Sequence, residues 1–126
     1  MRQLEITRPD SKLAAYLEQF RKEHADDPLG DVATRVLHED ERVKIWEMEL
    51  EPGAASDLHR HERDYYLVML AGDRIVGLPK QTSDGDAVVL DLPRGASTLR
   101  IEKGATEWAV NVGKERFYEI LIELKS

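Results

Sequence analysis

The sequence predicts a mostly-β domain, either a closed barrel or a two-sheet jelly roll, preceded by one N-terminal helix. Residues 10–24 carry apolar side chains at helical spacing. From Val32 onward the pattern changes to short stretches rich in β-branched and aromatic residues, separated by turns that contain glycine. Closing or doubling the sheet is how many short strands hide their edges. For a chain of 126 residues we expect one structural domain, with residues 1–31 as helix and linker and residues 32–126 as the barrel.

The N-terminal helix has a start and a stop signal. Asp10 or Ser11 is suited to the N-cap, and Leu13, Leu17 and Phe20 fall on one stripe. The segment 26–30, with two aspartates, a proline and a glycine, ends the helix. The helix could be a lid or an arm exchanged between subunits, but the pattern favours a helix that packs on the barrel and covers an edge.

Eight strands are expected after the helix, at 34–37, 43–50, 65–70, 74–78, 87–92, 97–101, 107–111 and 116–124. The strand at 43–50 does not alternate cleanly between apolar and polar residues, because both of its faces are apolar. Val43 and Ile45 share one face, and Trp46, Met48 and Leu50 share the other. Either both of its faces are buried or a bulge lies near Trp46. If both are buried, a subunit contact is expected on the outer surface.

Composition excludes several classes of protein. Apolar residues make up 41% and charged residues 34%, which is too charged for a membrane protein and too apolar for a disordered one. The chain has no cysteine, so disulfides, thiolate zinc sites and cysteine nucleophiles are excluded. The net charge of −7 repels phosphate backbones and anionic lipids, so we expect neither a nucleic-acid nor a membrane partner. A cytoplasmic protein is expected.

The segment His59-Arg60-His61 carries the clearest chemical signal. On a strand, side chains alternate, so both imidazoles point to one face and offer two nitrogen donors for a transition metal. The pair alone is weak, because two solvated histidines would show the same spacing.

The surrounding spacing resembles the first cupin motif at Gly53, His59, His61 and Gly72, with Tyr65 where that family has a glutamate ligand. The second motif is similar at Gly104 and Asn111. Within that second segment, Glu102 replaces a proline and Glu107 stands where the family has its third histidine. The resemblance covers about residues 36–124, and the closing segment 117–124 looks like that of small bacterial cupins. Some of those share the His-x-His-x3-Tyr pattern and are labelled β-alanine-degradation cupins.

This resemblance implies a cupin double-stranded β-barrel in which the motif positions converge. His59, His61 and Glu107 would then hold one divalent transition metal, and Fe, Mn, Ni, Co and Zn all accept such donors. A phenol with an ordinary pKa near 10 ligates only after losing its proton, so Tyr65 is expected as a hydrogen-bonding neighbour and proton donor. The alternative is a barrel without metal, in which Glu107 hydrogen-bonds to the histidines or faces water.

Two functions follow as hypotheses. The first is a metal-dependent enzyme, oxygenase- or isomerase-like, acting on a small polar organic molecule with Tyr65 as a catalytic residue. The alternative is a non-catalytic module that binds a small molecule or a structural metal. A homodimer is expected, because Tyr66, Val68 and Leu70 have the opposite parity to the inward histidines and form an apolar outer face.

Three further expectations concern single side chains. Leu67 and Met69 share the parity of Tyr65 and should line the interior. Arg63 shares it too, and would hold an anionic group there or pair with Asp64 or Glu62. Two other histidines, at positions 24 and 38, are expected to be isolated surface or helix-face residues.

Overall fold

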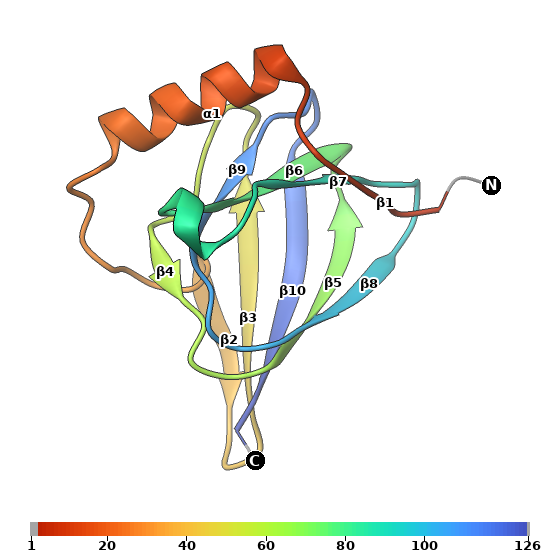
Figure 1. The fold of residues 1–126 in the computed structure, drawn as a ribbon. Coiled ribbons are helices and arrows are strands. Elements are labelled where there is room, and N and C mark those ends of the chain that lie inside the picture. Colours follow the sequence, from red (N-terminus) through yellow and green to blue (C-terminus); the bar gives the residue numbers. More distant parts are fainter. Residues whose placement is uncertain (1–2, 126) are drawn as a thin grey trace.

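The computed structural model describes residues 3–125, which form two antiparallel sheets and one helix (Figure 1). The first sheet has the order β1-β7-β6-β9-β4, built from β1 (Glu5–Thr7), β4 (His59–Arg60), β6 (Arg74–Pro79), β7 (Val88–Asp91) and β9 (Thr106–Asn111). The second has the order β2-β3-β10-β5-β8, built from β2 (Arg35–Glu39), β3 (Val43–Leu50), β5 (Tyr65–Ala71), β8 (Ser97–Ile101) and β10 (Phe117–Leu124). Within residues 3–125, no helix is long and apolar enough to cross a membrane.

The structure confirms the predicted mostly-β architecture with its N-terminal helix. All eight expected strands are present, with ends displaced by two residues at most. Two short strands, β1 and β4, and a 3-10 turn at Thr82–Asp84 were not predicted. The two strands are too short to show a periodic pattern, and they form because β7 and β9 offer pairing partners.

The inner faces of the two sheets enclose the first apolar core. On β3, Trp46 and Met48 point inward and are 6% and 2% exposed. The pairing of β2 with β3 shifts register between Val36 and His38, next to Trp46. The irregularity in this region is therefore a bulge, and it lies on the neighbouring strand β2.

Helix α1 (Ser11–Glu23) covers the outer face of the first sheet and encloses a second core (Figure 1). Asp10 is the N-cap, with its Oδ1 accepting from the Leu13 amide at 2.8 Å. Leu17 is 2% exposed and packs with Trp108 and Val110 of β9. The expected packing on the barrel is confirmed, but the helix lies over a sheet face and not over an edge, because the apolar outer residues of β6, β7 and β9 need a cover.

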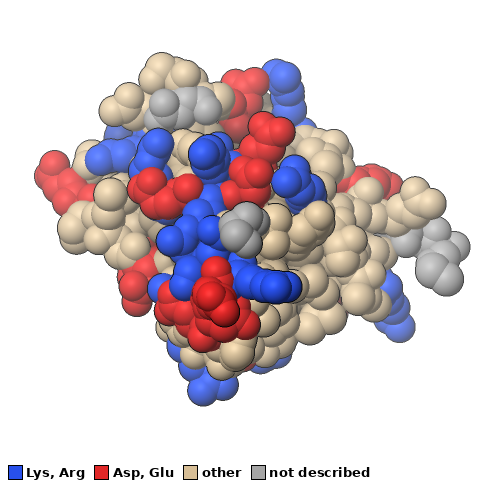
Figure 2. Space-filling model, turned by 90° about the horizontal axis from the view of Figure 1, so that it is seen from below, with Lys and Arg blue, Asp and Glu red and all other residues tan. Residues whose placement is uncertain are grey.

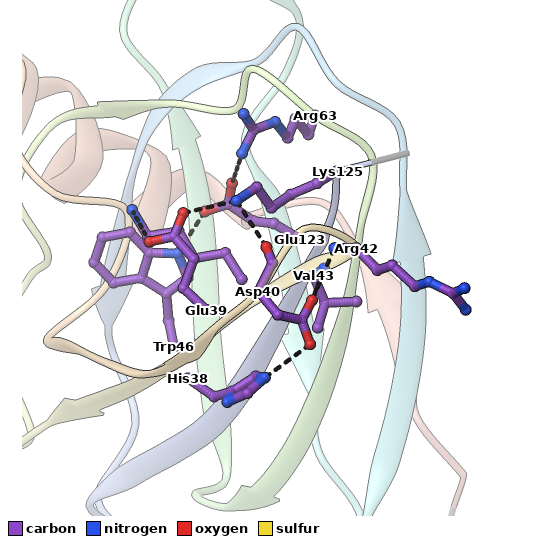
Figure 3. A network of polar contacts seen from close by, with 10 residues as sticks. His38, Glu39, Asp40, Arg42, Val43, Trp46, Arg63, Glu123 and Lys125 are labelled. Atoms are coloured by element: carbon purple, nitrogen blue, oxygen red, sulfur yellow. Dashed lines mark hydrogen bonds and ion pairs between the residues drawn. The ribbon is translucent and has the colours of Figure 1, made fainter.

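A polar network closes the end of the barrel near the C-terminus (Figure 3). Glu123 accepts a hydrogen bond from the Trp46 indole at 2.5 Å and lies 3.9 Å from Arg63. Lys125 donates to Glu39 at 2.9 Å. Seen from below, basic and acidic side chains lie side by side over this end (Figure 2).

Three side-chain expectations are corrected here. The Arg63 side chain is 42% exposed and pairs with Glu123, so it neither lines the interior nor pairs with Asp64 or Glu62. It precedes the first residue of β5, where strand alternation does not yet hold. His24, the C-cap of α1, and the exposed His38 are surface residues as expected, but they are not isolated. His24 lies 3.0 Å from Asp27 and His38 lies 2.9 Å from Asp40. Leu67 and Met69 are buried in the first core as expected.

Asn111 ties the end of β9 to the turn before β10. It is 1% exposed, and its amide nitrogen donates to the carbonyls of Leu50 and Glu115, both at 2.9 Å. Its Oδ1 accepts from the Gly113 amide at 2.9 Å. The Asn111 side chain thus joins the end of β3 and the turn before β10 to β9 through three hydrogen bonds.

We expect Asn111→Ala to lower the free energy of unfolding by about 2–4 kcal/mol, because it leaves buried carbonyl and amide groups without a partner. Urea denaturation would measure the loss. Lys114→Ala, an exposed change in the same turn, serves as the control and should stay within about 0.5 kcal/mol of the parent. Equal effects of the two substitutions would contradict the role given to Asn111.

Candidate metal centre in the barrel

Backbone pairing brings the motif residues together. In the antiparallel pair of β4 and β9, His59 lies opposite Glu107. The ladder continues past β4, because the His61 amide donates to the Ala105 carbonyl at 2.9 Å. His61 therefore points to the same side as His59, and one ligand atom from each of His59, His61 and Glu107 lies within 4.8 Å of the others.

The position of the His59 ring fixes its tautomer. Its Nδ1 lies 2.9 Å from the carbonyl oxygen of Asp57. A carbonyl only accepts, so Nδ1 carries the proton and Nε2 keeps its lone pair. The Ser56 hydroxyl lies 3.4 Å from the same Nδ1 and accepts from the Ala109 amide at 2.9 Å. Such outer partners orient histidine ligands in metal sites.

His61 lies between Glu107 and Tyr65. Its Nε2 is 3.7 Å from Glu107 Oε1, and its ring stacks on Tyr65 with centroids 3.8 Å apart. Its Nδ1 is buried and has no hydrogen-bond partner among the described residues. Burial, with a smaller effect from His59, lowers the pKa of His61 to about 3, so the imidazole is neutral at pH 7 and has a lone pair to donate. Burial also lowers the pKa of His59.

Two carboxyl groups face the same cavity. Burial raises the pKa of Glu107 to about 7. Gly77 lies against this carboxyl, since a Cβ there would come 3.3 Å from Glu107 Oε2. The second group, Glu119 on β10, is 4% exposed, and burial followed by the nearby Glu107 raises its pKa to about 8. The sequence reasoning missed Glu119, although Phe117 and Leu121 of the same parity could have indicated its inward direction.

Tyr65 lies in the same cavity and is 1% exposed. Burial, followed by the charges of Glu107 and Glu119, raises the pKa of its phenol above the ordinary value. In the metal-free chain the phenol is therefore protonated at pH 7.

The cavity has a volume of about 280 Å³. Apart from the two histidines, Tyr65 and the two glutamates, its walls are apolar, with side chains from both sheets: Met48, Leu67, Ile75, Leu90, Leu99 and Ile101. Val88 lines the cavity and is 40% exposed, so the cavity opens beside β7. The site is thus a small apolar chamber with a few converging polar groups, as ligand sites commonly are.

Comparison with known proteins identifies the fold. No family model matches the chain, and no curated protein does. A solved cupin domain from Bordetella pertussis Tohama I is 27% identical, with a TM-score of 0.62 over 78% of this chain and 96% of that one. A cupin family protein with a double-stranded β-helix fold from Methanocaldococcus jannaschii is 10% identical, with a TM-score of 0.57 over 78% and 87% of the two chains. The fold is therefore the double-stranded β-helix of cupins.

The residues present fit a divalent transition metal. Two neutral imidazoles and one carboxylate converge, one imidazole is oriented by a carbonyl, and the other has a buried nitrogen without a partner. This donor set is the one that Fe(II) uses in non-haem sites, and it also suits Mn, Ni, Co and Zn.

The raised carboxyl pKa values predict a pH effect on the metal-free protein. The unfolded chain releases the Glu119 proton near 4.5 and the folded chain near 8, so rising pH between these values favours unfolding. We expect Glu119→Gln to match the parent in stability near pH 5 and to become progressively more stable than the parent toward pH 9. Urea denaturation with a chelator present would measure this difference, and the exposed change Glu51→Gln should show no such trend. If the stability of the parent rose relative to that of Glu119→Gln as the pH increases, the prediction would be contradicted.

Proposed function

We propose that the barrel binds one divalent transition metal through His59, His61 and Glu107 and acts as a metal-dependent enzyme on a small organic molecule with a polar group. The observation that supports this most directly is the convergence of the three donors within 4.8 Å inside a cavity of about 280 Å³. When bound, the metal supplies a Lewis acid or an oxygen-binding centre, which suits an oxygenase- or isomerase-like reaction.

In this proposal the chain's own residues have distinct tasks. His59 and His61 offer neutral nitrogen donors, and Glu107 offers a charge that offsets part of the metal's own. Tyr65 holds a proton on its buried phenol and can donate it to a substrate oxygen in the cavity. The apolar walls keep water away from the reacting groups.

The resemblance of the His-x-His-x3-Tyr segment to β-alanine-degradation cupins supports a place for this chain near that group. A second candidate function is a non-catalytic module for a small molecule or a structural metal. The predominantly apolar cavity walls support this second function, because they suffice to retain a small molecule without any reaction. Oxygen uptake by the metal-loaded protein with a panel of small acids, thiols and diketones tests for an oxygenase. NMR spectra of the same mixtures detect an isomerised product, so a module that only binds would give neither oxygen uptake nor a new product.

The metal proposal is tested with ligand variants. We expect His59→Ala and Glu107→Ala to weaken metal binding at least about tenfold, because two remaining donors compete poorly with water. Glu107→His should restore binding, with a changed preference among metals. Chelator competition and elemental analysis would measure affinity and content, with circular dichroism to confirm the fold. His38→Ala, at an exposed histidine, is the control. Parent-like affinity in Glu107→Ala would remove Glu107 from the site, and full occupancy in His59→Ala would refute the site.

We also propose that a second copy of the chain covers the outer face of the second sheet. Ile122 lies between Ile45 and Tyr66 across neighbouring strands, and Ile120 lies beside Val68. Tyr66 is 40% exposed in the single chain. An apolar row in the middle of a sheet face is typical of a surface that is covered in the assembled protein.

We expect light scattering at micromolar concentration to give the mass of two chains for the parent and of one chain for Tyr66→Asp, because a buried unpaired charge opposes association. Tyr16→Asp is the matched control, since Tyr16 is a similarly exposed tyrosine on the helix. A parent with the mass of one chain would contradict the homodimer.

A further inference from the structure

Glu119 is a buried acid on the wall opposite the candidate metal centre. On β10 it lies between Met48 of β3 and Met69 of β5, so it belongs to the second sheet, whereas Glu107 and His59 belong to the first. It is 4% exposed, and its side chain lines the cavity. The group of converging metal donors does not include it.

Within the part of the chain that the structure describes, no hydrogen bond or ion pair reaches the Glu119 carboxyl. The neighbouring inward acid, Glu123, differs in this respect, because it accepts from Trp46 and lies beside Arg63. Glu47, buried on the same sheet, is paired with Arg35 and Tyr118. Among the described residues only His61 Nδ1 is fully buried without a partner, so the Glu119 oxygens border the cavity. A hydrogen-bond partner for them has to come from a molecule inside that cavity.

The cavity that Glu119 lines has room for a ligand. Gly77 and Ala109 of the first sheet line the cavity with little or no side chain, while Leu67 and Leu90 supply apolar surface. The cavity therefore offers one acidic group on one sheet, the metal donors on the other, and apolar contacts along the walls.

We propose that Glu119 is a ligand-binding residue, and that it accepts a hydrogen bond from an ammonium or hydroxyl group on a small molecule whose apolar chain fills the barrel cavity. An N–H or O–H donor supplies the partner that the protein itself does not give. The raised pKa of Glu119 is consistent with a carboxyl that awaits this partner. The role concerns binding and requires no bond to be made or broken.

The first test uses metal-free protein with two probes, n-butylamine and n-butanol, titrated at pH 8.5 and followed by amide NMR shifts. We expect at least one probe to bind the parent, and Glu119→Met to weaken that probe at least about tenfold. If neither Glu119→Gln nor Glu119→Met binds n-butylamine, the group that Glu119 binds is an ammonium. Loss of n-butanol in Glu119→Met, with retention in Glu119→Gln, identifies a hydroxyl.

Glu51→Met is the matched control, because it makes the same substitution at an exposed glutamate outside the cavity and should alter affinity less than about threefold. Circular dichroism would confirm that each variant is folded. The inference is overturned if neither probe binds the parent, or if Glu119→Met binds both probes as tightly as the parent does.

A second test uses ligands with one group for the metal and one for Glu119, and it rests on the proposed function. The protein is first loaded with Zn(II) to a measured stoichiometry. Both 6-aminohexanoate and 6-hydroxyhexanoate should compete with hexanoate, and at least one of them should bind more tightly than hexanoate does. Glu119→Met should abolish that advantage while leaving the metal content unchanged. If the chain takes up no metal, the proposed function fails, whereas the metal-free comparison still decides the role of Glu119.

Discussion

The candidate site depends on the antiparallel pairing of β4 with β9. β4 has two residues, and the backbone bond from His61 to Ala105 extends its pairing by a further step. Since paired residues point to the same side of a sheet, this ladder sets His59 against Glu107, and His61 follows at the period of a strand. Backbone hydrogen bonds thus assemble the donors, which gives the site a rigid base on which side chains need little ordering of their own.

Burial of polar groups has a cost that the rest of the fold must offset. The cavity holds neutral imidazoles, a phenol and two carboxyls, several of them with pKa values moved by burial. The helix contributes a second apolar core on the outer face of the first sheet, where Leu17 packs with Trp108. Because β9 carries Trp108 outward and Glu107 inward, the helix stabilises the strand that presents the polar site.

The sequence reasoning succeeded where a pattern is long or a spacing is specific. The strand 43–50 and the spacing of His59, His61 and Glu107 are of this kind. β1 and β4 were missed because their existence depends on distant partners. Glu119 was missed because a glutamate is normally assigned to a solvent-facing position. The parity of Phe117 and Leu121 indicates the inward direction, and the register with Met48 and Met69 establishes it.

β10 connects the interior of the barrel to its outer surface. It is hydrogen-bonded to β3 on one side and to β5 on the other, and its side chains alternate between Phe117, Glu119 and Leu121 inside and Ile120 and Ile122 outside. A strand that reads as a nearly continuous apolar run is typical of burial on both faces. In the proposed dimer, the second copy covers Ile120 and Ile122, and Glu119 directly precedes Ile120 in the same strand. Association would therefore restrain the wall that carries the unpaired carboxyl and hold it at a constant position relative to the donors on the opposite sheet.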